Sequence, residues 1–259
     1  MKALLEAGAN IDAVRCRKNV LSHAISANNE DGVRFLLNNK VDLRIDHLPQ
    51  TPTLPLRAAL RSDPIMSLLA RNGAPLEAEY DISSLLRLNI LQEAVTQGRE
   101  SIIKILLDNG AEVDACSSSN GTALMIALAM GRASIAKLLI EKGADVNYTR
   151  PASKTCPYTN PVEAAIGGGQ SKLLELLFRA GAVTDMLQAM KFAHAKSDYP
   201  LIPSATSQFG LESNTTRSFY DVMVMLAQRD LRYVCYFGKY DNVETKREGI
   251  RRMMNELCK

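Results

Sequence analysis

Cysteine and histidine are the residues of this chain best suited to bind a metal or to act as nucleophile and base. The five cysteines form no CxxC pair, the spacing typical of zinc sites: they are Cys16, Cys116, Cys156, Cys235 and Cys258. The histidines are His23, His47 and His194, and none has metal-ligand spacing to a cysteine or to another histidine. We therefore expect no metal site, no cofactor and no catalytic residue. A remote alternative stays open, an enzyme whose cysteine and histidine meet only in the folded chain.

Two further motifs could bind phosphate. The glycine run 167–169 lacks a Walker lysine and follows a predicted helix rather than a strand, so it predicts a helix end and a turn. The basic pairs Lys246-Arg247 and Arg251-Arg252 alternate with glutamates, which is typical of a solvated helix face. The net charge is only +3, from 31 basic and 28 acidic residues. This balance argues against nucleic acid or a membrane surface as a partner.

The cysteine count and the first residues indicate a compartment. An odd number of scattered cysteines gives no disulfide framework and favours reduced thiols. Residues 1–14 contain Glu6 and Asp12 and no continuous apolar run, so they do not read as a signal peptide. No segment approaches the roughly 18 consecutive apolar residues of a membrane-spanning helix. These features predict a soluble cytoplasmic or nuclear protein.

The elements that position these residues come from an internal repeat. A phrase that begins with leucine and usually contains Gly-Ala recurs six times: LLEAGANID (4–12), LLNNKVDLR (36–44), LARNGAPLE (69–77), LLDNGAEVD (106–114), LIEKGADVN (139–147) and LFRAGAVTD (177–185). Its leading leucines lie 32 to 38 residues apart. The phrase predicts a helix that ends at its glycine, because glycine adopts a left-handed conformation at little cost. Lys40 replaces this glycine in the second copy.

A second phrase precedes most of these leucines by 17 residues. Its copies are NVLSHA (19–24), LPLRAA (54–59), NILQEA (89–94), TALMIA (122–127) and NPVEAA (160–165). The polar first residue predicts a helix N-cap, and the third and sixth residues share one helical face. Gly98, Gly131 and Gly169 predict the turn into the next helix. The third copy lies only 15 residues before Leu69, so its turn is predicted to be shortened.

The two phrases, in this fixed order, resemble the ankyrin pattern TPLHxA…GxxxxxxxLLxxGA over about residues 1–186. The TPLH tetrapeptide is complete nowhere, and its histidine slot holds Ser22, Arg57, Gln92, Met125 and Glu163. The resemblance implies an all-α solenoid of paired antiparallel helices with hairpin-like loops, built from one partial and five fuller repeats. Residues 187–259 break the period. We expect them to form a degenerate helical cap, with an independent module as the alternative.

The resemblance also implies a function, which is non-catalytic binding of another protein by a monomer through the concave face of the solenoid. The positions that bind partners in the family map onto Ser26, Ala27, Arg61, Ser62, Thr96, Gln97, Ala129, Met130, Gly167 and Gly168. In the loops they map onto Arg15, Lys18, Gln50, Ser118, Ser119 and Tyr158. Met130 and Tyr158 are the preferred anchors, because thioethers and aromatic rings supply contact area at modest entropic cost.

Two alternatives and one modification accompany this hypothesis. The chain begins inside a repeat, which fits a scaffold fragment of a larger protein. It could equally be a substrate adaptor of a signalling or ubiquitin-ligase-type assembly, with a tail that recruits a second partner. The resemblance further makes Asn147 a candidate for hydroxylation by a dioxygenase. The competing interpretation is a hairpin asparagine that bonds its own backbone.

Overall fold

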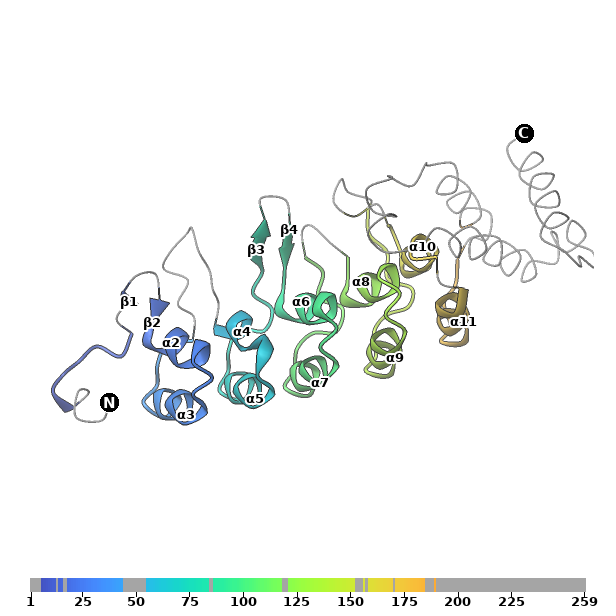
Figure 1. Cartoon of the computed structure of the whole chain (residues 1–259). Helices are drawn as coiled ribbons and strands as arrows, with labels where there is room; N and C mark the ends of the chain where they lie inside the picture. The colour runs from blue at the N-terminus through green and yellow to red at the C-terminus, as the bar shows by residue number, and fades with distance from the viewer. Residues whose placement is uncertain are drawn as a thin grey trace, which may run out of the picture. The chain divides into compact units, whose positions relative to one another are not determined.

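The computed structural model describes residues 6–12, 14–15, 18–43, 55–83, 86–117, 121–151, 156, 158–169, 171–184 and 189. The chain divides into two compact units, residues 1–123 and 124–259. Each unit contains pairs of short helices joined by tight turns (Figure 1). No described helix combines the length and the apolar character needed to cross a bilayer.

Unit 1 contains three helix pairs. The first is α2 (Val20–Ser26) with α3 (Glu30–Asn38), and the last is α6 (Ile90–Gln97) with α7 (Glu100–Asp108). In the middle pair, α4 (Pro55–Ala58) continues into the 3-10 helix η1 (Ala59–Arg61) and is followed by α5 (Asp63–Arg71). Helix α2 contacts α4 in one row, and α3, α5 and α7 pack in sequence in a second row (Figure 1). The predicted shortened turn is thus a 3-10 ending that leads almost directly into α5.

Unit 2 repeats the same arrangement. Helices α8 (Ala123–Ala129) and α9 (Ala133–Glu141) form one pair, and α10 (Pro161–Gly167) and α11 (Ser171–Arg179) form the next. Helix α11 contacts both α10 and α9. The predicted boundary at residue 186 lies among residues outside the described part and stays a prediction.

The predicted N-caps are confirmed at three helices. The Asn19 side chain accepts a hydrogen bond from the backbone N–H of Ser22 at 2.7 Å. Asn89 and Asn160 accept equivalent bonds at 2.9 Å, and Gln92 completes a capping box by accepting from the Asn89 N–H. Each cap satisfies an amide that the helix cannot, which stabilises the helix by about 1 kcal/mol. Thr122 is fully buried directly before α8.

The predicted core is confirmed as well. The leading leucines of the six-fold phrase, from Leu36 to Leu177, are at most 1% exposed, while Leu4 lies outside the described residues. The alanines that end the second phrase are also buried, which lets neighbouring helices approach closely. The glycines that follow the helices have positive φ, for example 91° at Gly143. Lys40 holds the same place in the second repeat with φ of 58°.

Two short β-hairpins modify the all-helical expectation. β1 (Val14–Arg15) pairs with β2 (Lys18–Asn19), and β3 (Tyr80–Ser83) pairs with β4 (Leu86–Leu88). The second hairpin lies between Leu69 and Leu106, an interval four residues longer than that between Leu106 and Leu139. The paired residues Tyr80 and Leu88 are both buried at its base. Hairpin-like loops were expected from the repeats, but their strands were not.

Consecutive repeats are joined by a recurring hydrogen bond, which we call the hairpin bridge. The last side chain of the six-fold phrase accepts a bond from a backbone N–H in the next copy. Asp12 accepts from Asp42 at 2.9 Å, Glu77 from Glu112 at 2.8 Å, and Asn147 from Val183 at 2.7 Å. Between the second and third repeats these places hold Arg44 and Pro75. An arginine has no acceptor and a proline has no N–H, so the bridge cannot form there.

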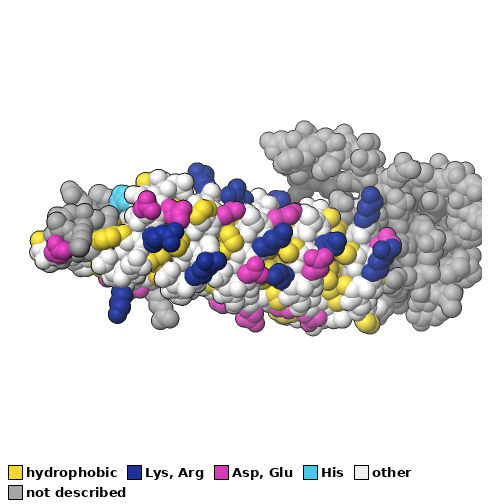
Figure 2. All heavy atoms as spheres, turned by 90° about the horizontal axis from the view of Figure 1, so that it is seen from below, with side chains coloured by type: hydrophobic (Ala, Val, Ile, Leu, Met, Phe, Trp, Pro, Cys, Tyr) yellow, Lys and Arg dark blue, Asp and Glu magenta, His cyan; other side chains and the backbone are white. Residues whose placement is uncertain are grey.

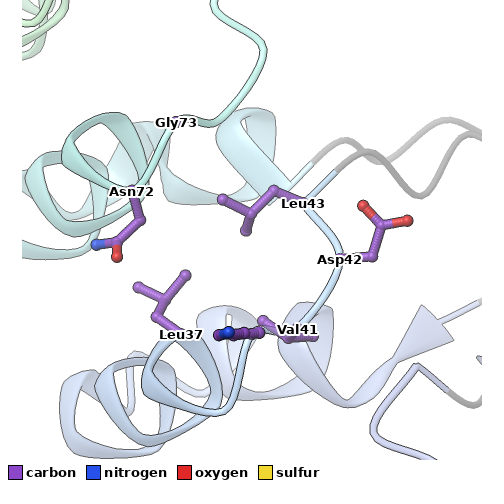
Figure 3. Close-up of a pocket in the computed structure, with 7 residues that line it drawn as sticks. Leu37, Val41, Asp42, Leu43, Asn72 and Gly73 are labelled. Carbon is purple, nitrogen blue, oxygen red and sulfur yellow. The ribbon is translucent and has the colours of Figure 1, made fainter.

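A cavity lies at this junction. Its volume is about 520 Å³, and the described residues that line it include Leu37, Leu43, Asn72 and Gly73. Figure 3 shows Leu37 and Leu43 from one repeat and Asn72 from the next pointing toward the open space between them. The junction without a hairpin bridge therefore borders a pocket that is open to solvent.

Candidate protein-binding surface

The residues predicted to bind a partner lie at the ends of the first helices. In unit 1, Ser26, Ala27, Arg61 and Gln97 are exposed, whereas Ser62 and Thr96 are half-buried. In unit 2, Met130 and Gly167 are exposed, and Ala129 and Gly168 are half-buried. We call these ten residues the helix-end surface. Met130 leaves 49% of its surface exposed, although its neighbour Leu128 is fully buried.

Two of these predicted partner-binding positions, Gly167 and Gly168, also serve packing within unit 2. A Cβ atom on Gly168 would lie 2.5 Å from the carbonyl oxygen of Leu128 and 2.9 Å from that of Ala129. A Cβ atom on Gly167 would collide with the ring of Tyr158. Gly168 therefore lets the end of α10 approach α8 closely, and Gly167 leaves room for the Tyr158 ring. The predicted helix end and turn are confirmed, because α10 ends at Gly167 and Gly169 has φ of 66°.

The predicted loop residues are placed only in part. Arg15 lies in β1 and Lys18 in β2, while Gln50, Ser118 and Ser119 lie outside the described residues. Tyr158 is half-buried against Gly167, and burial raises the pKa of its phenol above the usual value. Its ring is therefore partly committed to packing within unit 2.

Asn147 does not bond its own backbone, so that interpretation is wrong. Its side-chain oxygen accepts from the Val183 N–H, and its amide nitrogen donates to the Gly181 carbonyl at 3.3 Å. The next repeat places the Val183 N–H and the Gly181 carbonyl within hydrogen-bonding distance of this side chain. The side chain is nevertheless exposed.

A buried charge network in unit 1 was not predicted. Glu93 on α6 is only 5% exposed. One of its oxygens accepts from the Arg57 Nε at 3.2 Å and from the Gln97 Nε2 at 3.0 Å. Its other oxygen accepts a short hydrogen bond from the Tyr80 hydroxyl. The network thus joins α4, α6 and the β3–β4 hairpin.

Burial and the neighbouring carboxylate keep the Tyr80 phenol protonated. Burial, reinforced by the hydrogen bond to Glu93, raises the pKa of Tyr80 far above its usual value. The phenol therefore keeps its proton and donates. The guanidinium of Arg57 also lies over the Tyr80 ring, 5.5 Å from its centroid, in a cation–π contact. In the sequence, the only sign of this network is Arg57, which occupies the histidine position of the TPLH pattern. Its partner Glu93 lies 36 residues later, in the next repeat.

The residues considered for chemistry remain apart in the described regions. No group of three His, Cys, Asp or Glu residues there could hold a metal ion. Cys116 is an exposed free thiol and Cys156 a buried one, and His23 is exposed on α2. The other cysteines and histidines lie outside the described residues.

The second helices present a different face. Figure 2 shows basic and acidic side chains interspersed over it. Exposed i,i+4 ion pairs lie on three of its helices: Arg34 with Glu30, Lys137 with Glu141, and Arg179 with Glu175. Such pairs contribute only about 0.3–0.5 kcal/mol each. This face has the character of an ordinary solvated surface.

Comparison with known families identifies the repeat. Residues 56–150 match the family model described as ankyrin repeats (3 copies). Residues 56–150 therefore consist of ankyrin repeats, and the helix pairs of the described residues form a mostly helical repeat fold. Comparison with the curated proteins gives no match. Ankyrin repeats are generally protein–protein interaction modules and are typically non-enzymatic.

Proposed function

We propose that this protein binds a partner protein through the helix-end surface and the neighbouring hairpin tips, without catalysing a reaction. The observation that carries the proposal is the exposure of Met130. It is one of two large hydrophobic side chains that the described residues leave exposed, the other being Val183. An unbranched thioether at the end of a packed helix adapts to a partner and supplies apolar contact area.

The contrast between the two faces supports this choice. Basic and acidic side chains are interspersed over the second helices (Figure 2), and three i,i+4 ion pairs join some of them. The helix-end surface has no such regular pairing in unit 2, where Ala129, Met130 and Gly167 are uncharged. Interface centres are depleted of charge and enriched in methionine and aromatic residues. The apolar part of the helix-end surface therefore fits a protein partner better than the second helices do.

The test is a double substitution, Ala129→Glu with Met130→Glu, read by affinity capture beside a thermal melt. The matched control is Ala133→Glu with Ala180→Glu, which adds the same charge at two exposed alanines of the second-helix side. Both variants should fold, because surface changes usually cost within about 0.5 kcal/mol. The first should lose partners that the control retains, because unpaired charge at an interface centre is expensive. A folded first variant that keeps every partner would place the binding surface elsewhere.

We propose finer roles on the same basis. The protein acts inside the cell as a monomeric scaffold or substrate adaptor, with residues 187–259 recruiting a second partner. Deleting those residues should then abolish one interaction and spare another. Asn147 is proposed as a hydroxylation site, since its side chain is exposed in unit 2. Peptide mass spectrometry that finds only unmodified Asn147 in the native protein would remove that proposal.

A further inference from the structure

We infer that Arg57 and Arg61 form a carboxylate-binding site in unit 1, which takes an aspartate or glutamate side chain from an acidic segment of the partner. The inference rests on the proposed function and adds the chemistry of the partner. Arg57 lies in α4, and Arg61 ends the 3-10 helix η1 four residues later. Across such a stretch the two residues differ in direction by at most about a third of a turn.

Arg57 is held in a fixed orientation. Its Nε donates to Glu93, and its guanidinium plane lies over the Tyr80 ring. These two contacts restrain the long side chain from two directions, yet 32% of it remains exposed. A guanidinium that is already ordered loses less conformational entropy when it binds a carboxylate.

The terminal nitrogens of Arg57 have no acceptor among the described residues, since Glu93 accepts from Nε alone. Glu93 leaves the remaining N–H donors of Arg57 to an incoming carboxylate. Its two oxygens are already occupied by Arg57, Gln97 and Tyr80, and its side chain is 7% exposed.

Arg61 supplies the second positive charge. It is exposed at the end of η1, and no described carboxylate forms an ion pair with it. Asp63 follows at the start of α5 but forms no ion pair with Arg61. Neither Glu93 nor Asp63 pairs with Arg61, so its guanidinium is available to a ligand among the described residues. A guanidinium attracts a carboxylate, and its planar fork suits the two oxygens of that group.

A peptide selection tests this inference on the full chain. A random peptide library displayed on phage is selected on the immobilised protein, and recovered peptides are then titrated against variants. The informative variant is Arg61→Gln, and the control is Arg71→Gln, which removes the same charge from an exposed position of α5. Arg57→Lys keeps the charge but removes the fork, and a thermal melt checks that it folds.

The expected peptides are enriched in aspartate or glutamate relative to the library. Arg61→Gln should weaken their binding roughly tenfold, as expected for loss of a charge-assisted hydrogen bond. Arg71→Gln should change it by less than about twofold. Replacing the peptide's acid with its amide should cause at least the same loss in the native chain, and a smaller loss in the Arg61→Gln variant, where only Arg57 remains to bind the acid.

Three outcomes overturn the inference. They are recovered peptides without acidic enrichment, acidic peptides that bind Arg61→Gln as well as they bind the native chain, and no recovered peptide at all. Each leaves the proposed function to its own test, because whole partner proteins are captured there and the substitutions lie in unit 2.

Discussion

Glu93 is a buried carboxylate that holds polar side chains at the helix-end surface of unit 1. Burying a carboxylate is costly unless its oxygens are paired and hydrogen-bonded. Here Arg57, Tyr80 and Gln97 together satisfy both oxygens. The same contacts order Arg57 and Gln97, so the buried charge shapes the polar groups that a partner meets.

Lys40 has a strained backbone conformation. Its φ of 58° places an ordinary side chain in the left-handed region, where the other repeats have glycine. That conformation costs a non-glycine residue roughly 1–2 kcal/mol, and part of this is regained through the stiffer unfolded chain. We therefore expect Lys40→Gly to stabilise the protein by about 0.5–1 kcal/mol in a denaturant melt.

The matched control for Lys40→Gly is Gly143→Ala. Gly143 has φ of 91°, and a Cβ atom there would meet nothing within 4 Å. Its substitution should therefore destabilise the protein through the backbone alone, by about 1 kcal/mol. Equal stability of the native chain and Lys40→Gly would show that the lysine conformation carries no strain.

Residue chemistry that acts locally could be predicted from the sequence. The caps at Asn19, Asn89 and Asn160 depend on amides three residues away, and the helix-ending glycines depend on their own φ. The Glu93 network could not be predicted, because Arg57 lies 36 residues away and Tyr80 lies 13 residues away. The packing role of Gly168 likewise required the position of α8.

Among the elements, the hairpins determine how firmly neighbouring repeats are joined. A hairpin bridge links the repeats at Asp12, Glu77 and Asn147. The first two involve carboxylates, which make stronger hydrogen bonds than neutral acceptors. The junction of Arg44 and Pro75 lacks this bond and borders the cavity of about 520 Å³. It is therefore expected to open more readily than the other junctions of unit 1.

Restoring the missing bridge tests this expectation. Arg44→Asp with Pro75→Ala supplies an acceptor and a donor at the places that form the bridge elsewhere. In hydrogen exchange, the new amide of residue 75 should exchange roughly tenfold more slowly than in Pro75→Ala alone, which has the donor without the acceptor. Equal exchange rates in the two variants would show that the bridge does not depend on these two residue types.

The repeat period predicted the helices better than the strands. Both helical phrases repeat with apolar residues that face the core, so pattern and packing agree. The β3–β4 hairpin lies in one of the two longer intervals of the repeat, between Leu69 and Leu106; the other longer interval lies between Leu139 and Leu177. Its strands are short, and a bulge interrupts their pairing between Asp81 and Ser83. Alternation over so few residues is a weak sequence signal.

At the scale of the whole molecule, the two units offer different chemistry on the same structural positions. Unit 1 presents Arg57 and Gln97, both bonded to a buried carboxylate, and the exposed Arg61, whereas unit 2 presents Ala129 and Met130. The packed positions of both units are apolar and are committed to the core. Variation at the helix ends is thus where a repeat protein can adapt to a partner without loss of stability.

Site-specific photocrosslinking tests the central claim most directly. A benzophenone amino acid is placed singly at Gln97 and Met130 on the helix-end surface, and at Arg71 and Ala133 on the second-helix side, all of which are exposed. After irradiation in an extract of cells that make the protein, mass spectrometry identifies the crosslinked proteins. We predict specific crosslinks to a partner from positions 97 and 130 and none from positions 71 and 133. Crosslinks only from positions 71 and 133 would contradict the account.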